Sequence, residues 1–137
     1  MKAHITSPFD SRIMLCYSYP QDKLERLKTV ADEFKFVVRV LADSDLCNTV
    51  GNLLTERGGG SADYNPVNTG TEALIFSPVK QKQLYAVLDA LTANDANTDY
   101  KAMMSPANAG MKLDELITAI IKEHRQMHDA AQAVKKE

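Results

Sequence analysis

One segment, residues 72–128, constrains the fold more than any other part of the chain. It begins with a short, wholly apolar run at 73–76, which is typical of a strand covered on both faces. A Ser-Pro turn, an amphipathic helix, a second strand at 100–105 and a long helix at 112–134 follow. This alternation of strands and helices predicts an α/β protein.

The first half of the chain shows the same order of patterns. It predicts a strand at 12–18, a helix at 21–33, a strand at 35–41 and a helix at 44–56. We interpret the two halves as an internal repeat, a βαβα unit present twice. The apolar positions of the first helix in each half then correspond: Leu24 to Leu84, Leu27 to Val87 and Ala31 to Leu91.

The character of the strands limits the topology of the sheet. The two uninterrupted apolar strands belong in its centre, and the strands that contain Arg39 and Lys101 belong at its edges. A parallel, doubly wound sheet in the order 2-1-3-4, with right-handed crossovers, satisfies this. A ferredoxin-like sheet in the order 4-1-3-2 with an inserted helix satisfies it too. The helix at 44–56 is native to the parallel arrangement, which we therefore favour.

The domain organisation follows from the same patterns. Residues 1–11 are polar and irregular and predict a flexible arm. A single α/β domain at 12–134 consists of the halves 12–56 and 72–134, joined by a glycine-rich linker at 57–71. A phosphate-binding loop would need Lys and Ser or Thr directly before a helix, and the linker has no such sequence.

Composition excludes several classes of protein. The net charge of −2 and the pI of about 5.9 argue against nucleic-acid binding. No apolar run approaches the ~20 residues of a membrane span, and the N-terminus has no apolar core of a signal peptide. Cys16 and Cys47 lie in apolar segments without metal or redox spacing, which suits reduced thiols. We expect a cytoplasmic protein with neither membrane nor nucleic acid as partner.

Short motifs in the second half resemble those of a bacterial family catalogued as a domain of unknown function (number 3783). In that family Phe-Ser-Gly, Lys-Ala, Thr-Pro-x-Asn, Trp-Thr and Glu-Glu-His follow one another. Here Pro78 replaces the glycine, and Met111-Lys112 replaces Trp-Thr. The first half is similar to the region that precedes the domain in longer members. The resemblance supports a small α/β fold and implies no activity, substrate or cofactor. The matching residues are Phe76-Ser77, Lys101-Ala102, Ser105-Pro106-Ala107-Asn108, Leu113, Leu116, Glu123 and His124.

A parallel sheet predicts a ligand crevice at the carboxyl ends of strands one and three, where the strand order reverses. Serine hydroxyls beside helix N-termini there would favour an anion, although capping of the helices is the commoner use. This gives an alternative function: a protein that binds a small ligand, phosphate or nucleotide, or a small enzyme. The residues that would line the crevice are Tyr17, Ser18, Ser77 and Asn108.

No catalytic or metal-binding constellation is evident. His124 and His128 share one face of the last helix, but the sequence is not a zinc-peptidase motif and offers no third ligand. Cys16 lies in an apolar strand, where burial makes a thiol inert. Asp114 and Glu115 fall in the first turn of a helix, where the helix dipole favours negative charge. We expect no metal, no cofactor and no catalytic residue.

The preferred interpretation is a non-enzymatic binding or protein-interaction domain, with a regulatory role. The last helix is longer than a four-stranded sheet needs, about 34 Å at 1.5 Å per residue. Its apolar face therefore continues past the sheet as a surface for a second copy or another protein. That surface consists of Ile121, Met127, Ala131 and Val134.

Overall fold

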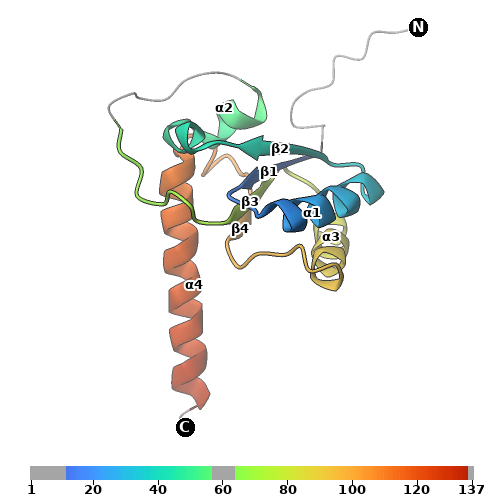
Figure 1. Cartoon of the computed structure of the whole chain (residues 1–137). Coiled ribbons are helices and arrows are strands. Elements are labelled where there is room, and N and C mark those ends of the chain that lie inside the picture. The colour runs from blue at the N-terminus through green and yellow to red at the C-terminus, as the bar shows by residue number, and fades with distance from the viewer. Residues whose placement is uncertain (1–11, 57–63, 136–137) are drawn as a thin grey trace, which may run out of the picture.

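The computed structural model describes residues 12–56 and 64–135, which form a four-stranded sheet with helices on both faces (Figure 1). The predicted α/β class is confirmed. The predicted arm at 1–11 and the linker residues 57–63 lie outside the described residues. The elements are β1 (Ile13–Tyr17), α1 (Gln21–Glu33), β2 (Val37–Leu41), the 3-10 helix η1 (Asp43–Cys47), α2 (Val50–Leu54), β3 (Ala73–Phe76), α3 (Gln81–Ala93), β4 (Lys101–Met103) and α4 (Leu113–Lys135).

The helix predicted at 44–56 is divided into η1 and α2. Asn48 has an extended backbone, with ψ at 155°, and its side-chain oxygen accepts a hydrogen bond from the N–H of Thr49 at 2.9 Å. The hydroxyl of Thr49 in turn accepts a hydrogen bond from the N–H of Asn52 at 3.3 Å and so caps α2. Asn and Thr side chains compete with helical hydrogen bonds in this way, which is why the helix restarts here.

The strand order β2-β1-β3-β4 is the predicted one. Pairing of β1 with β2 and of β3 with β4 is parallel, also as predicted. The central pair differs: β1 and β3 are antiparallel, with Leu15 opposite Ile75, so the sheet is mixed and not wholly parallel. The order also excludes the ferredoxin-like alternative, in which β1 would lie between β4 and β3.

The reversal of β3 decides which helices share a face. In a wholly parallel sheet of this order, right-handed crossovers would place α1 and α3 on opposite faces. Because β3 runs against β1, the second crossover packs on the same face as the first. The second helices of the two halves, α2 and α4, then cover the other face. A strand covered on both faces has the same apolar pattern in either direction, so the sequence could not reveal the reversal.

The face covered by α1 and α3 holds one hydrophobic cluster. The Phe36 and Phe76 rings meet edge to face with their centroids 6.2 Å apart, which joins the end of the first crossover to β3. Both halves of the chain contribute to this cluster, so neither half has a core of its own. Its buried members are Met14, Cys16, Leu24, Leu27, Val30, Ala31, Phe36, Leu74, Phe76, Val87, Leu91 and Ala96.

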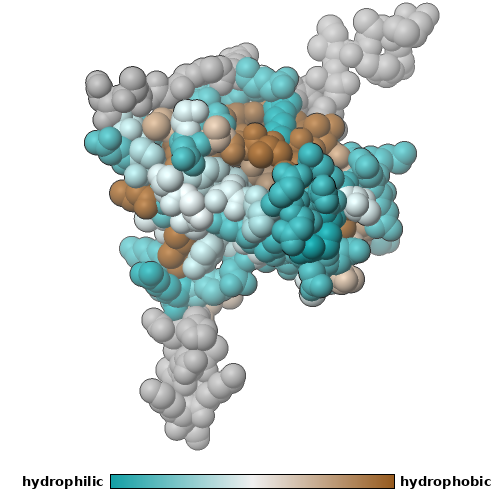
Figure 2. All heavy atoms as spheres, in the orientation of Figure 1, coloured by the Kyte–Doolittle hydropathy of each residue, from teal (hydrophilic) through white to brown (hydrophobic). Residues whose placement is uncertain are grey.

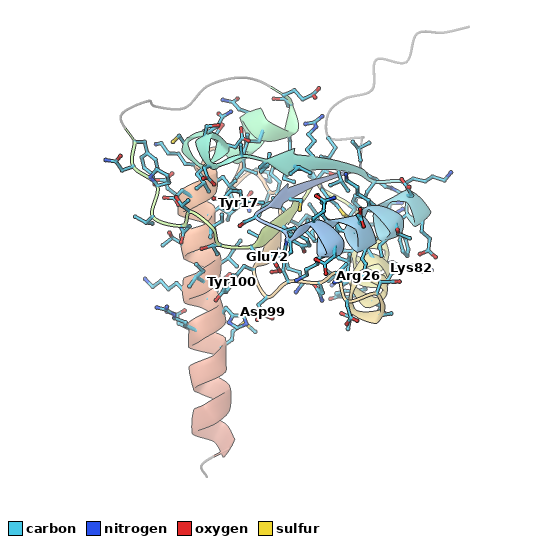
Figure 3. The ribbon with its side chains drawn as sticks, in the orientation of Figure 1. Tyr17, Arg26, Glu72, Lys82, Asp99 and Tyr100 are labelled. Atoms are coloured by element: carbon cyan, nitrogen blue, oxygen red, sulfur yellow. The ribbon has the colours of Figure 1, made fainter. Side chains whose placement is uncertain are left out.

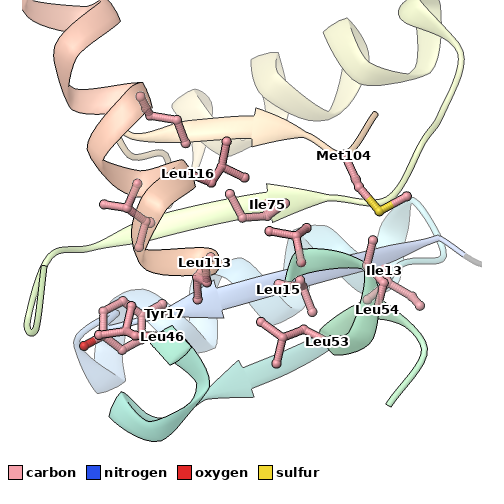
Figure 4. Close-up of a cluster of buried hydrophobic side chains, with 14 residues drawn as sticks. Ile13, Leu15, Tyr17, Leu46, Leu53, Leu54, Ile75, Met104, Leu113 and Leu116 are labelled. Atoms are coloured by element: carbon pink, nitrogen blue, oxygen red, sulfur yellow. The ribbon is translucent and has the colours of Figure 1, made fainter. Parts of the chain in front are cut away.

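The opposite face is covered by η1, α2 and the first turns of α4 (Figure 4). Alternate residues of the central strands, such as Leu15 and Ile75, point to this side. This cluster, too, draws on both halves. Its buried members are Ile13, Leu15, Tyr17, Leu46, Val50, Leu53, Leu54, Ala73, Ile75, Met104, Leu113, Leu116, Ile117 and Ile120.

Some local features of residues 12–56 and 72–135 are alike. Helices α1 and α3 each have 13 residues, and each is followed by a left-handed residue, Lys35 with φ at 62° and Asp95 with φ at 55°. An isolated antiparallel bridge joins Thr49 to Lys112, the residues directly before α2 and α4.

Candidate interaction surface along helix α4

The first turns of helix α4 anchor it to the body. It has 23 residues, and among those whose side chains the structure describes, 113–127, the last buried one is Ile120. Ile121 is half-buried and residues 122–127 are exposed. Figure 1 shows the helix crossing the sheet and continuing past β4. The part of α4 from 122 to 127 is therefore surface that the described body does not cover.

The carboxylate of Asp114 fixes the start of α4. The side chain is 1% exposed and accepts hydrogen bonds from the Tyr64 hydroxyl at 2.6 Å and from the Asn68 N–H at 2.9 Å. The Val67 N–H and the Asn68 side-chain amide also donate to it, at 3.1 and 2.9 Å. Residues 64–68, the described end of the predicted linker, are thus fastened to α4.

The same contacts determine the protonation of the two acidic groups. Burial alone would raise the pKa of Asp114, but the hydrogen bonds from Tyr64, Val67 and Asn68 outweigh it and hold the pKa below its usual value. The hydrogen bond to Asp114 raises the pKa of Tyr64 to about 12. The carboxylate is charged and the phenol neutral at neutral pH, which is the combination that this hydrogen bond needs.

A hollow of about 460 Å³ lies between the Asp114-bound loop and α4. Val67, 77% exposed, and the half-buried Ile121 supply its apolar surface. Lys122 and Arg125 line it from α4, and among the described residues neither forms an ion pair. The hollow therefore combines apolar side chains with two uncompensated positive charges. Its lining residues are Val67, Asn68, Thr118, Ile121, Lys122, Arg125 and Gln126.

A second hollow, of about 520 Å³, lies on the other side of α4 near β4, where Figure 3 shows Glu72, Asp99 and Tyr100. Two of its three charges are already engaged: Lys23 forms an ion pair with Glu72, and its ammonium lies 5.1 Å from the centre of the Tyr19 ring. A ligand would have to displace these contacts, so the hollow beside Val67 is the better binding site.

The crevice predicted at the carboxyl ends of strands one and three does not exist as one site. Because β1 and β3 are antiparallel, Tyr17 pairs with Ala73, whereas Ser77 lies beside Ile13. These ends of β1 are about 13 Å apart, at 3.3 Å per residue. The prediction that these residues form one crevice is therefore wrong, and the alternative function, binding of a small ligand, has no site at this place.

The predicted crevice residues have structural contacts where the structure places them. The Tyr17 hydroxyl donates to the Asp43 carboxylate at 2.7 Å. Ser18 is exposed with φ at 61°, and the buried Ser77 hydroxyl accepts a hydrogen bond from the Ile13 N–H at 2.8 Å. Neither serine caps a helix, since the N-caps of α1 and α3 are Pro20 and Lys80.

Asn108 lies at the same end of the sheet as Ser77 and closes the loop after β4. Its side-chain oxygen accepts a hydrogen bond from the Ser105 N–H at 2.8 Å, and its amide donates to the Met103 carbonyl at 3.2 Å. The loop then docks on α2, where the Gly51 N–H donates to the Ala109 carbonyl at 2.9 Å. The Ser-Pro-x-Asn motif thus has a structural explanation.

The remaining predicted residues lie on α4 or in β1. His124 is exposed and meets the Tyr100 ring edge to face, with centroids 5.5 Å apart, and the described residues contain no cluster of ligands for a metal. The side chain of His128 is outside the described part. Burial raises the pKa of Cys16 to about 12, so this thiol stays protonated at neutral pH.

The predicted interface residues differ in their surroundings. Ile121 packs partly against the core, whereas Met127 is 74% exposed. The side chains of Ala131 and Val134 are not among those described, although both residues are helical. Met127 is therefore the described residue that continues the apolar stripe of α4 beyond the sheet.

Residues 72–127 match the family described as Domain of unknown function (DUF3783). They form a DUF3783 domain. The match covers β3, α3, β4 and α4 up to Met127, and the first half of the chain lies outside it. No curated protein and no solved structure is significantly similar to the chain.

The residues of the DUF3783 domain do not form a complete hydrophobic core by themselves. Both hydrophobic clusters combine its residues with those of β1, α1 and α2. Where the family pattern has Trp-Thr, Lys112 stands directly before α4, and its N–H donates to the Glu115 carboxylate at 2.9 Å. This contact caps the N-terminus of α4 in the absence of the threonine.

Among the described residues, no helix combines the length and apolar character needed to cross a membrane.

Proposed function

We propose that this chain is a non-enzymatic interaction module that binds an acidic, amphipathic segment of another protein along α4. The observation that carries the proposal is the hollow beside α4. It joins the exposed Val67 and the half-buried Ile121 to Lys122 and Arg125, which form no ion pair with a described acidic residue. An apolar anchor flanked by acidic side chains complements this surface.

The rigidity of the surface supports the proposal. Val67 is held through its own N–H by Asp114, and Asn68 donates to the Thr118 hydroxyl at 2.8 Å. Both walls of the hollow are thus joined by hydrogen bonds before a partner arrives. A surface ordered in advance loses less conformational entropy on binding.

Charge argues for another protein over a second copy on this face. Two copies meeting there would bring Lys122 and Arg125 close to the same residues of the second copy, and like charges at an interface disfavour association. The homodimer expected from the sequence would use the stripe of Ile121, Met127, Ala131 and Val134, which shares Ile121 with the hollow. Light scattering distinguishes this homodimer from binding of another protein.

The test uses a short synthetic helical peptide with leucines on one face and glutamates beside them, labelled for fluorescence anisotropy. We expect saturable binding that weakens with salt. Lys122→Glu with Arg125→Glu should weaken it about tenfold or more, since two attractive rim charges of about 0.2–1 kcal/mol each become repulsive. Lys82→Glu, an exposed charge reversal on α3, is the matched control and should bind normally.

Equal binding by the reversed variant and the control would contradict the proposal, as would equal binding of a peptide with lysines in place of glutamates. Light scattering on the unliganded chain tests for the homodimer. Self-association lost in Met127→Glu but retained in Gln126→Glu would favour a homodimer through α4.

We also propose that the two halves are copies of one βαβα unit. Equal lengths of α1 and α3, the left-handed residues after them and the Thr49–Lys112 bridge support this. Replacing 21–33 by the sequence of 81–93 tests it, because the apolar positions coincide. The exchanged chain should unfold in one cooperative transition, and a molten or insoluble product would contradict the equivalence.

We infer in addition that the protein works in the cytoplasm. Both cysteines are free, and Cys16 is buried. Thiol labelling of denatured, freshly lysed cells should modify both cysteines. A disulfide-linked species that resists labelling would contradict a reducing compartment.

A further inference from the structure

The outer edge of the sheet at β2 is an apolar strand whose second side is unpaired within the described residues. The Val37 N–H donates to the Arg12 carbonyl, so the backbone of Val37 and then Arg39 faces β1. By alternation along the strand, the N–H and C=O groups of Val38 and Val40 point outward. Val37 and Val40 are 58% and 57% exposed.

Proteins usually protect such an edge with a charged side chain, a proline or a bulge. The charge in β2 does not serve this purpose. The Arg39 guanidinium turns back and donates to the carbonyls of Leu53 at 2.9 Å and Leu54 at 2.6 Å, at the end of α2. It also lies 3.6 Å from the Glu56 carboxylate. The charge of Arg39 is therefore bonded to the C-terminal end of α2, and the outer edge of β2 stays apolar.

The opposite edge shows the contrast. Strand β4 has only three residues and begins with Lys101, whereas β2 has five, of which four are valine or leucine. Figure 2 shows a hydrophobic surface over β2. The two edges therefore differ in length and in apolar character, and β2 is the one suited to pairing.

We propose that β2 pairs antiparallel with β2 of a second copy, so that the two sheets join into one. A two-fold axis at Arg39 places Val38 opposite Val40 of the second copy and Val37 opposite Leu41 of the second copy. Val38 and Val40 carry the outward N–H and C=O groups, so these pairs exchange hydrogen bonds in both directions. The two Arg39 residues face each other on the axis. Every other cross-strand pair within the five residues of β2 is apolar.

This self-complementarity is the reason to prefer a second copy to a foreign strand. The strand presents the same apolar sequence to itself in reverse, and each Arg39 keeps Glu56 of its own copy as counter-ion. A five-residue contact is small compared with the ≈1,200 Å² or more of stable interfaces. The dimer is therefore weak and depends on concentration.

The β2 edge is remote from the surface of the proposed function. In Figure 1, α4 continues past β4, away from β2. Pairing through β2 would leave the Val67 hollow of each copy open, at opposite ends of the joined sheet. The dimer is thus a bivalent form of the interaction module, and the pairing does not depend on what the hollow binds.

Sedimentation velocity of the full chain over the micromolar range tests the pairing. We expect reversible self-association in the wild type and none in Val40→Lys. Tyr85→Lys on α3 is the matched control, because Tyr85 is 56% exposed and Val40 57%, and it should associate as the wild type does. Circular dichroism establishes that both variants fold.

Amide exchange on the wild type keeps the proposal testable if Val40→Lys does not fold. Protection of the Val38 and Val40 amides should rise with protein concentration, while the Val37 amide is protected throughout. A monomer at every concentration, or exchange at Val38 and Val40 that ignores concentration, would overturn the proposal. Self-association that survives Val40→Lys but not Met127→Glu would also overturn it.

Discussion

The substitution Asp114→Asn tests the anchoring of α4 and of the loop that forms one wall of the hollow. It keeps the size of the side chain but removes the charge and replaces one accepting oxygen with an NH2 group. The carboxylate accepts from Tyr64, Val67 and Asn68. With its oxygen in the place of Oδ1, the amide keeps the bonds from Asn68, whereas the NH2 group faces Tyr64, whose hydroxyl must rotate to accept, and Val67, which keeps only its longer bond of 3.2 Å.

The magnitude follows from which donors can find another partner. The Asn68 backbone N–H belongs to a buried residue and stays bonded to the remaining oxygen, but a hydrogen bond to a neutral acceptor contributes about 0.5–1.5 kcal/mol in place of about 1.5–3 for a charged one. Tyr64 and Val67 border solvent, so water replaces most of what they lose. Summing this weakening over the remaining bonds, we expect a loss of about 2–3 kcal/mol, a large share of a typical 5–15 kcal/mol.

The dependence on pH adds a second signature. The pKa of Asp114 is lower in the folded chain than the ordinary value, about 3.9, of the unfolded one. Its stabilisation is therefore complete above that ordinary value and is lost as the pH falls through the folded pKa. The difference between wild type and Asp114→Asn should stay constant from pH 7 to 5 and shrink below about pH 4.

Urea unfolding, monitored by circular dichroism, measures the loss as a shift in midpoint at unchanged slope. Asp89→Asn, at an exposed position on α3, is the control and should change the free energy of unfolding by less than about 0.5 kcal/mol. If the two variants lose the same amount, the Asp114 contacts do not hold the loop and the reasoning is refuted.

Three further outcomes follow from the packing. Arg39→Ala removes the donor to two carbonyls at the end of α2 and should destabilise the chain by about 1–3 kcal/mol in the same urea assay; an unchanged midpoint would contradict this. The fragment 72–137 should give no cooperative unfolding transition in calorimetry, because its apolar faces pack on the first half of the chain. A sharp transition would contradict this and show that the DUF3783 domain has an independent core. Since burial raises the pKa of Cys16 to about 12, a thiol reagent at pH 8 should modify only Cys47 until urea is added, and prompt reaction of both would refute the burial.

The strand order could be predicted from side-chain character, and the direction of β3 could not. Continuous apolar runs placed β1 and β3 in the centre, and the charges of Arg39 and Lys101 placed β2 and β4 at the edges. When both faces of a strand are covered, a continuous apolar run is expected for parallel and antiparallel pairing alike. Direction depends on the path of the connection between β2 and β3, which carries no periodic pattern.

The binding surface was predictable only in part, for a reason of distance along the chain. The excess length of α4 was visible in its sequence, because an apolar stripe is a local pattern. The partners of Asp114 lie 46 to 50 residues away, so its position in the first turn suggested only the helix dipole. Likewise, Ser77 accepts a hydrogen bond from Ile13, 64 residues away, and Asn108 closes its own loop, and a motif alone does not distinguish these uses from ligand binding.

The most direct test of the proposed function is a titration of the wild-type chain with the acidic amphipathic peptide, followed by amide chemical shifts. The account predicts shifts that saturate and are concentrated at Val67, Asn68, Lys122 and Arg125. Shifts confined to other surfaces, or none at peptide concentrations that saturate the anisotropy signal, would contradict it.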